Sequence, residues 1–506
     1  MKHYLLLLLL AVGFISCKKD QSENTGDPEF SINEDAATFT EVGSIDIGDA
    51  GAAEITAFDP ATNRLFVVNN GTVNKIDVVD FKDPANMKVI SSIPMLPYGG
   101  AVNSVVVYGG KLAAAIESTD KQANGKVAVF NTADNSEVKV INVGALPDMV
   151  TYSPDGKFIL TANEGEPNAA YTNDPAGTIS IISVDNNYAV TTIDFSAFVS
   201  QKATLAAKGF RIFGPGNDFV KDIEPDYITV SEDSKTAWVT LQENNGIAKI
   251  DLASKTITSI FPLGFKDYSV AGNEIDPSDK DDKVGVPAKW NIKGIYMPDA
   301  IYVFTSNNIP YLFTANEGDA REYTAFVEAE RVKNLTLDPT AFPNASDLKK
   351  DAQLGRLNVT KTLGDIDGDG DYDALYSFGA RSFSVWNGVD GTQVFDSKNE
   401  LDAKNVAAGY YDDNRSDDKS VEAEGMAIGK IGNKMVAFVG MERVDAVAVY
   451  DITTPTKPVF LQLLKCGDAP EGVLIIPASK SPTRRSLLVV SSEDDGQVKI
   501  YSPKMI

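Results

Sequence analysis

The chain has 506 residues, of which 43% are apolar and 9% aromatic, so it contains ample material for a hydrophobic core. Its formal net charge is −25 and no basic cluster stands out, which argues against nucleic acid and anionic membrane surfaces as partners. The composition predicts a soluble protein with an acidic surface.

The first residues form a predicted targeting segment. A lysine precedes an unbroken apolar run from Tyr4 to Ile15, which is too short to span a bilayer and is typical of a signal peptide. The run ends in Phe14-Ile15-Ser16-Cys17, which resembles a bacterial lipobox, with an ordinary secretory signal as the alternative. We expect a signal peptide over residues 1–16, a lipid on Cys17, and a flexible tether over residues 17–37. The charged residues after Cys17 favour an extracytoplasmic, surface-exposed lipoprotein of the outer membrane.

The few histidines and cysteines exclude several kinds of active site. Cleavage of the signal peptide removes His3, the single histidine, so the mature chain would contain no imidazole. That excludes a Ser-His-Asp triad, a Cys-His pair and His-ligated zinc, iron or haem. Cys466 would then be the one unmodified cysteine, so we expect neither an internal disulfide nor a thiolate-bound metal cluster.

A short unit recurs seven times along the chain. An acid or amide, here named the opener, begins an apolar strand, and a second one, the closer, follows the next strand about sixteen residues later. Self-similarity at a period of tens of residues indicates a repeat architecture. The openers are Glu54, Asn103, Asp148, Asp226, Asp299, Glu424 and Glu471, and the closers are Asn70, Glu117, Glu164, Glu243, Glu317, Glu442 and Glu493.

Each unit has the pattern of three or four short strands separated by turn residues. Such sheets cannot bury both faces alone, which predicts an all-β, seven-bladed β-propeller over residues 38–506. The last unit contains three strands, and we expect Phe39–Ile47 to complete it and close the ring. In the fifth unit we expect residues 356–360 to form the third strand. The hairpin pattern over residues 381–396 leaves an eighth, incomplete blade open as an alternative.

Four stretches do not fit a plain blade and are predicted inserts, near residues 200–220, 266–291, 325–353 and 381–396. The first contains a predicted short helix, and Tyr323–Val332 also has helical spacing. Long insertions on a rigid scaffold often carry function.

The clearest chemical motif is DIDGDGDYD, which starts at Asp365. Alternate carboxylates and a glycine at the sixth position are typical of a loop that binds a hard cation. The chain has Tyr376 where an EF-hand needs glutamate, so the motif instead resembles the calcium hairpins of integrin-type propellers. An acidic turn without an ion is the alternative, but its carboxylates would repel one another. The predicted Ca²⁺ ligands are Asp365, Asp367, Asp369, Asp371 and Asp373, with Asp371 contributing its backbone carbonyl.

The openers and closers should meet around the central channel on one face of the ring. They could bind cations or support metal-assisted hydrolysis, or they could simply bond the backbone of the neighbouring blade. We favour the structural role for most of them, because a catalytic centre is usually asymmetric. The candidates for such an asymmetric centre are Glu164, Glu166, Glu317, Asp319 and Arg321.

Several long segments resemble the choice-of-anchor I family, relatives of mesenchyme-specific cell-surface glycoproteins. They include GAAEITAFDPATNRLFVVN, VGALPDMVTYSPDGKFILTANEGEPN, ANEGDARE, LGDIDGDGDYDALYSFGARSFSVW and RSDDKSVEAEG. The SPDGKF turn is also similar to that of YVTN-type propellers. The resemblance implies an extracytoplasmic propeller held at the cell surface, and some relatives carry an alkaline-phosphatase label.

Two functions are therefore open at this point. The first is a calcium-stabilised binding or adhesion module that is held to the outer membrane by its lipid and recognises an unknown extracellular ligand. The second is a calcium-dependent phosphoesterase with a carboxylate-lined metal site at the channel mouth. In that version Arg321, Arg381 or Arg443 would bind the phosphoryl oxygens.

Overall fold

In the computed structural model, which describes residues 32–506, short β-strands follow one another along the chain. Inner strands such as β3 (Arg64–Asn69) and β11 (Phe158–Asn163) are almost completely buried. Their continuous apolar, β-branched runs suit strands that are covered on both faces. The predicted signal peptide, Cys17 and most of the predicted tether lie outside the described residues.

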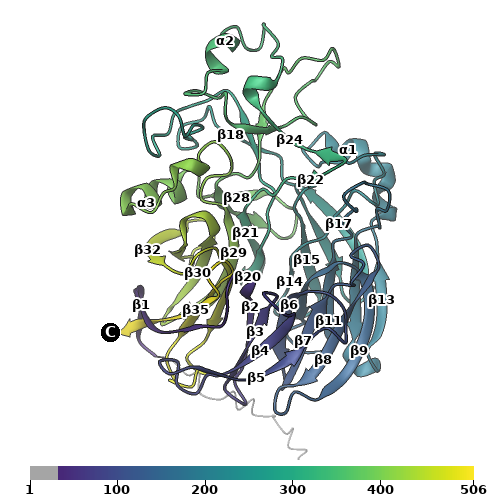
Figure 1. Ribbon diagram of the computed structural model, residues 1–506, viewed down its shortest axis with the longest axis vertical. Coiled ribbons are helices and arrows are strands. Elements are labelled where there is room, and N and C mark those ends of the chain that lie inside the picture. The colour runs from purple at the N-terminus through teal and green to yellow at the C-terminus, as the bar shows by residue number, and fades with distance from the viewer. Residues whose placement is uncertain (1–31) are drawn as a thin grey trace, which may run out of the picture. The chain divides into compact units, whose positions relative to one another are not determined.

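Seven four-stranded antiparallel sheets form the main body of the described residues (Figure 1). The first three contain β2 (Ala52–Asp59), β3, β4 (Lys75–Asp80), β5 (Lys88–Pro94); β6 (Val102–Tyr108), β7 (Lys111–Ile116), β8 (Asn124–Asn131), β9 (Glu137–Ala145); and β10 (Pro147–Tyr152), β11, β12 (Thr178–Ser183), β13 (Ala189–Ile193). The next two contain β14 (Ile228–Val230), β15 (Thr236–Leu241), β16 (Gly246–Asp251), β17 (Thr256–Pro262); and β20 (Ile301–Ser306), β21 (Ile309–Asn316), β27 (Ser382–Asn387), β28 (Gln393–Asp396). The last two contain β29 (Ala423–Ile431), β30 (Lys434–Met441), β31 (Ala446–Asp451), β32 (Val459–Lys465); and β33 (Pro470–Ile476), β34 (Leu487–Ser492), β35 (Gln497–Met505), β1 (Glu34–Asp46).

These sheets follow one another in a closed cycle. The first strand of each sheet contacts the first strand of the next, in the order β2, β6, β10, β14, β20, β29 and β33, and β33 contacts β2 again. A separate apolar core fills the space between each neighbouring pair of sheets, as where Phe66 and Leu112 pack together, or Phe438 and Leu488. A cycle of sheets that bury their faces against one another is the arrangement of a β-propeller, so the predicted all-β propeller fold is confirmed.

The two ends of the described chain meet in the last sheet. β1 pairs antiparallel with β35 over most of its length, for example Ile45 with Val498 and Ser44 with Lys499. Figure 1 shows these two strands side by side, although they are far apart in the sequence. The predicted pairing of the N-terminal strand with the last unit is therefore confirmed, and it removes an exposed sheet edge.

The fifth sheet departs from the prediction. Its third and fourth strands are β27 and β28, which follow a long insertion over residues 317–381. Residues 356–360, expected as the third strand, belong to the insertion instead, and residues 382–396, expected as an extra hairpin, supply β27 and β28 of this sheet. Sequence order favoured the first suitable strand after β21, and periodicity alone gave no sign that the chain leaves the sheet and returns to it.

The insertion supplies β24 (Ala329–Arg331), β25 (Asn358–Thr360) and β26 (Tyr376–Ser377) to a five-stranded sheet. Its other two strands, β18 (Phe265–Asp267) and β19 (Lys293–Ile295), come from the segment before the fifth four-stranded sheet. The insertion also contains the hairpin of β22 (Glu322–Tyr323) and β23 (Phe326–Val327). The expected helix over Tyr323–Val332 is therefore wrong, because strand pairing to β25 overrides the local helical spacing. In Figure 1 this part lies at the top, beyond the four-stranded sheets.

The helices in the described residues are short. They are α1 (Lys202–Ala206), α2 (Ala345–Leu348) and α3 (Glu400–Ala408), together with the 3₁₀ turns η1 (Val184–Asn186), η2 (Ser196–Gln201), η3 (Val332–Asn334), η4 (Asp413–Arg415) and η5 (Glu442–Val444). The short helix predicted in the first insert corresponds to α1. None of the helices in residues 32–506 has the length and apolar character needed to cross a bilayer.

Candidate functional site

The acids and amides of the repeat gather at one end of the ring. Each opener lies at or just before the start of the first strand of its sheet, and each closer follows the end of the second strand. Because these two strands are antiparallel neighbours, both positions fall at the same end of every sheet. Nine of these fourteen residues line a cavity of about 440 Å³: the openers Asn103, Asp148, Asp226, Asp299, Glu424 and Glu471, and the closers Glu164, Glu243 and Glu317.

The amide members of the series have a structural role. Asn70 donates its side-chain amide to the Glu54 carboxylate at 2.7 Å and to the backbone carbonyl of Val102, in the next sheet, at 2.8 Å. Asn103 likewise donates to the carbonyl of Pro147 at 3.3 Å. These bonds tie neighbouring sheets together, as the structural interpretation of the repeat predicts.

Several carboxylates of the series are instead buried without matching donors. Burial raises the pKa of Asp226 well above its ordinary value, and the charges of Asp299 and Asp148 raise it further. Burial, followed by the charge of Glu166, raises the pKa of Asp148 to about 6. Burial also raises the pKa of Glu243 to about 8, although Arg321 opposes that shift. Ionising these carboxyl groups in the cavity therefore costs free energy.

The five residues predicted for an asymmetric centre all line this cavity. Arg321, however, is buried and ion-paired, with Nη1 2.6 Å from the Asp222 carboxylate and Nη2 2.7 Å from that of Glu224. Its guanidinium also stacks on the ring of Phe213, 4.5 Å from the centroid. Burial opposes its charge, but Glu224 and Asp222 hold the pKa of Arg321 well above its ordinary value. The guanidinium is therefore committed to the protein and is poorly placed to bind a phosphoryl group.

The other two arginines considered for that role are also engaged. Arg381 is buried away from the cavity and donates to the carbonyls of Asp276 and Ser416, each at 2.7 Å. Arg443 pairs with Glu442 at 2.8 Å and with Glu422 at 3.4 Å. All three arginines therefore stabilise loops and carboxylates of the chain itself.

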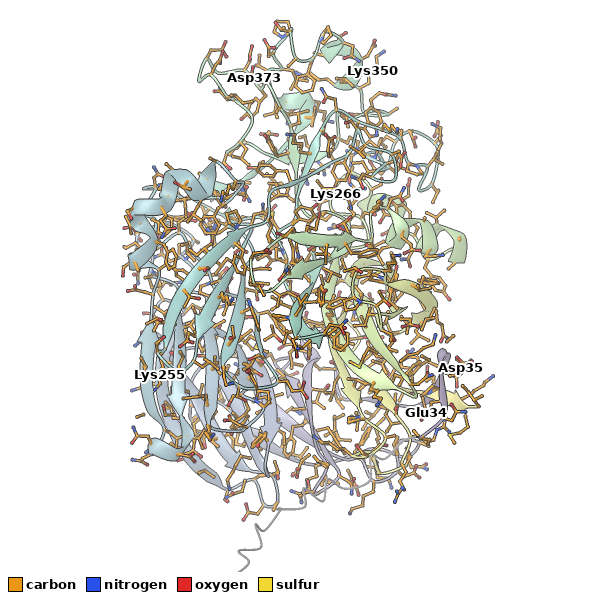
Figure 2. The ribbon with its side chains drawn as sticks, turned by 180° about the vertical axis from the view of Figure 1, so that it is seen from behind. Glu34, Asp35, Lys255, Lys266, Lys350 and Asp373 are labelled. Atoms are coloured by element: carbon orange, nitrogen blue, oxygen red, sulfur yellow. The ribbon has the colours of Figure 1, made fainter. Side chains whose placement is uncertain are left out.

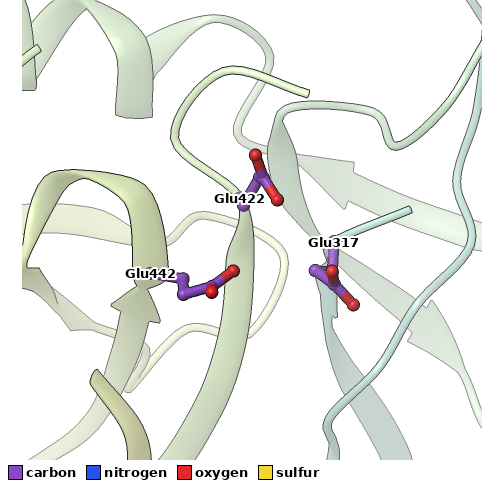
Figure 3. A group of neighbouring side chains, drawn as sticks. All are labelled: Glu317, Glu422 and Glu442. Atoms are coloured by element: carbon purple, nitrogen blue, oxygen red, sulfur yellow. The ribbon is translucent and has the colours of Figure 1, made fainter. Parts of the chain in front are cut away.

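A lysine that sequence reasoning missed neutralises one side of the cavity. The carboxylates of Glu317, Glu422 and Glu442 approach one another from three separate segments, with one oxygen of each inside a 4.8 Å group (Figure 3). The Lys419 ammonium bonds Glu317 at 2.8 Å and Glu422 at 3.1 Å. Burial would raise the pKa of Glu317, but Lys419 lowers it below its ordinary value. The counter-charge of this trio is therefore a side chain of the protein.

The aspartate loop lies in the insertion, between β25 and β26, which pair through Val359 and Ser377. This is the hairpin context that the sequence predicts. Asp365, Asp367 and Asp369 are exposed, and one carboxylate oxygen of each lies within 4.8 Å of the others. Figure 2 shows Asp373 in the outer part of the insertion, beyond the four-stranded sheets.

Backbone conformation shapes this loop. Gly368 and Gly370 have φ of 80° and 98°, which non-glycine residues rarely adopt. The backbone N–H groups of these two glycines donate to the Asp365 carboxylate at 2.8 and 3.2 Å, and that of Ile366 donates to Asp373 at 2.8 Å. The three clustered carboxylates offer the oxygen ligands that Ca²⁺ prefers, so the residues fit the predicted ion.

A second group of carboxylates lies beside the loop. Asp338, Asp371 and Asp373 also place one oxygen each within 4.8 Å of the others. A parallel bridge between Leu337 and Tyr372 brings Asp338 there from a distant part of the insertion. Asp371 therefore presents its side chain to this neighbouring group, whereas the motif alone assigned it only a backbone role.

Comparison with known proteins gives the following matches. A family model described as the choice-of-anchor I domain matches residues 54–455. Gigasin-3a of Magallana gigas is 28% identical over a match that covers 30% of this chain and 66% of its own length, just under two thirds. Kuenenia stuttgartiensis hydrazine synthase has 12% identity and a TM-score of 0.48, covering 91% of this chain and 97% of that one. The β-propeller domain of Cps50 (Swd1) from Myceliophteria thermophila has 8% identity and a TM-score of 0.47, covering 92% and 100%.

Proposed function

This chain belongs to the choice-of-anchor I family, and from that premise we propose that it is a binding or adhesion module of the bacterial cell surface. Membership suggests a cell-surface or extracytoplasmic protein. The scaffold in this proposal is a seven-bladed propeller, supported by the closed cycle of first strands and by the pairing of β1 with β35.

The observation that carries the binding role is the cavity at one end of the ring. Side chains from several sheets line it, and Ala320, Glu322 and Tyr323 of the insertion complete its wall. A concave polar site bounded by a rigid ring and a long insertion is a typical place for ligand recognition. Its surplus of carboxylates favours a cationic ligand or a ligand held through cations, and it disfavours nucleic acid.

The proposal also includes a lipid anchor on Cys17, in the outer membrane. It rests on the lipobox-like sequence before this cysteine and on the charged residues after it. If the anchor is correct, Cys17→Ser should move the protein from the membrane fraction of cells to the soluble or secreted fraction. Retention in the membrane fraction would contradict it.

Calcium in the aspartate loop would stabilise the insertion that completes the binding face. A bound ion at 100 times its Kd stabilises the folded state by about 2.7 kcal/mol. We expect Ca²⁺ to raise the melting temperature of the chelator-treated protein, and the double change Asp367→Asn with Asp369→Asn to abolish most of that rise. If Ca²⁺ raised the melting temperature of the double variant by the same amount, the loop would not be a calcium site.

The same samples test the phosphoesterase hypothesis. We expect no hydrolysis of p-nitrophenyl phosphate or of bis(p-nitrophenyl) phosphate, with calcium or after chelation, because Arg321 and Arg381 are held by protein groups. Calcium-dependent turnover of either ester would contradict the binding-module proposal and favour the hydrolase.

A further inference from the structure

Three aspartates from neighbouring sheets form a row on the cavity wall. Asp148, Asp226 and Asp299 belong to the starts of β10, β14 and β20, and all three line the cavity. The charges of Asp299 and Asp148 both raise the pKa of Asp226, as expected of carboxyl groups that share one wall. Ionised carboxylates are acceptors only and repel one another, so a proton or a cation is needed to balance them.

Buried oxygens without a donor face the same space. Asp226 is 8% exposed and Glu243 is 7% exposed, and each has one carboxylate oxygen with no hydrogen-bond partner. Glu424 and Glu471, also on the cavity wall, each have one such oxygen as well. A buried charged group without a partner is costly. A ligand from outside the protein that bonded these oxygens would therefore stabilise the wall.

Three hydrogen-bond donors on this wall are already used. Gln242 donates to Glu317 at 2.7 Å, and the Tyr323 hydroxyl donates to Glu166 at 2.7 Å. Arg321 is held by Asp222 and Glu224. The unmatched oxygens of Asp226 and Glu243 therefore call for donors or positive charge from outside the chain.

The chemistry of the unmatched groups favours a hard ion. All of them are carboxylate oxygens, which are the ligands that Ca²⁺ and Mg²⁺ prefer. The carboxylates of Glu317 and Glu422 differ from them, because the Lys419 ammonium already supplies their counter-charge.

We propose that the cavity binds a hydrated hard divalent cation, calcium or magnesium, through Asp226 together with Asp148 or Asp299. Waters of its hydration shell donate to the free oxygens of Asp226 and Glu243. This site is separate from the aspartate loop and does not depend on it. Coordination positions that face the open cavity are available to an oxygen of a bound ligand, which gives the binding module a metal-dependent mode of recognition.

Isothermal titration calorimetry of the chelator-treated full chain with CaCl₂, and separately with MgCl₂, tests the proposal. We expect the wild type to show binding in addition to that of the loop. Asp226→Asn should weaken the cavity binding at least about tenfold, as loss of a ligand does, and leave the loop binding in place. The double loop variant Asp367→Asn with Asp369→Asn should still bind one divalent cation. Asp233→Asn, an exposed aspartate outside the cavity, is the matched control.

Two outcomes would overturn the proposal. One is a double loop variant that binds neither calcium nor magnesium. The other is cavity binding of spermidine, lost in Asp226→Asn, with no binding of either metal there, which would identify an ammonium ligand instead. Asn keeps the size of Asp and removes a buried like charge, so the metal-free variant should melt no lower than the wild type. If it failed to fold, Asp299→Asn and the double loop variant would still test the site.

Discussion

The aspartate loop and the central cavity both gather carboxylates, but they balance that charge in different ways. In the loop, Asp365 and Asp373 accept hydrogen bonds from the loop's own backbone N–H groups, and the clustered side chains are open to solvent. In the cavity, Asp226 and Glu243 are buried with an unmatched oxygen each. The hydrogen bonds that shape the loop form within the loop itself, whereas the cavity exists only when the sheets close into a ring.

The difference matters for energetics. Water and salt screen exposed carboxylates, so these groups stay ionised without a bound cation at little cost in free energy. Buried ones penalise the folded state until a proton or a cation arrives, which is why the pKa of Glu54 and that of Glu243 are both raised to about 8. The cavity should therefore respond strongly to changes in its own charges, and the predictions below test that contrast.

The largest effect is expected where a buried charge loses its partner. Arg321→Ala leaves Asp222 and Glu224 buried without their cation, and it should lower the free energy of unfolding by about 3–5 kcal/mol. Urea denaturation followed by circular dichroism measures this change. If the variant is as stable as the wild type, Arg321 is not a structural ion-pair partner, and a functional role for its charge becomes the better explanation.

An exposed ion pair is the matched control for Arg321. Lys235 pairs with Asp233 at 3.3 Å, and their side chains are 75% and 57% exposed. Lys235→Ala should therefore cost no more than about 1 kcal/mol. If Arg321→Ala and Lys235→Ala lowered the free energy of unfolding equally, burial would not explain the difference between these two ion pairs.

The parts of the molecule that the sequence predicted well are those whose residues are adjacent or periodic. Asp365, Asp367 and Asp369 are close in sequence and their carboxylates gather as the motif predicts, and the repeat of openers and closers follows the strand pattern. The pairing of β1 with β35 was also predictable, because a unit with three strands lacks a partner for its edge.

What could not be predicted depends on contacts between distant segments. Lys419 reaches Glu317 across a long stretch of chain, and Asp338 joins the loop only through the bridge between Leu337 and Tyr372. Likewise, nothing local marks Arg321 as the partner of Asp222. The segment RSDDKSVEAEG contains Lys419 and Glu422 three residues apart, which is a helix-like charge spacing, yet their partner Glu317 comes from another sheet.

The remaining effect depends on pH, and it tests the buried acids of the repeat that lie beside the cavity. Burial raises the pKa of Glu54 to about 8, with Glu493, Asp148 and Glu117 adding to the shift and the amide of Asn70 opposing it. The unfolded chain loses this proton near pH 4.5, so the folded state binds more protons between pH 4.5 and 8 and loses stability as the pH rises through that window. In chelator, the melting temperature of the wild type should fall from pH 5 to pH 9. Glu54→Gln should match the wild type at pH 5 and melt higher at pH 9, whereas the exposed control Glu41→Gln should follow the wild type throughout. Parallel curves for all three proteins would mean that water solvates Glu54 as well as it solvates the acids of the loop, and the contrast between the buried repeat acids and the loop would fail.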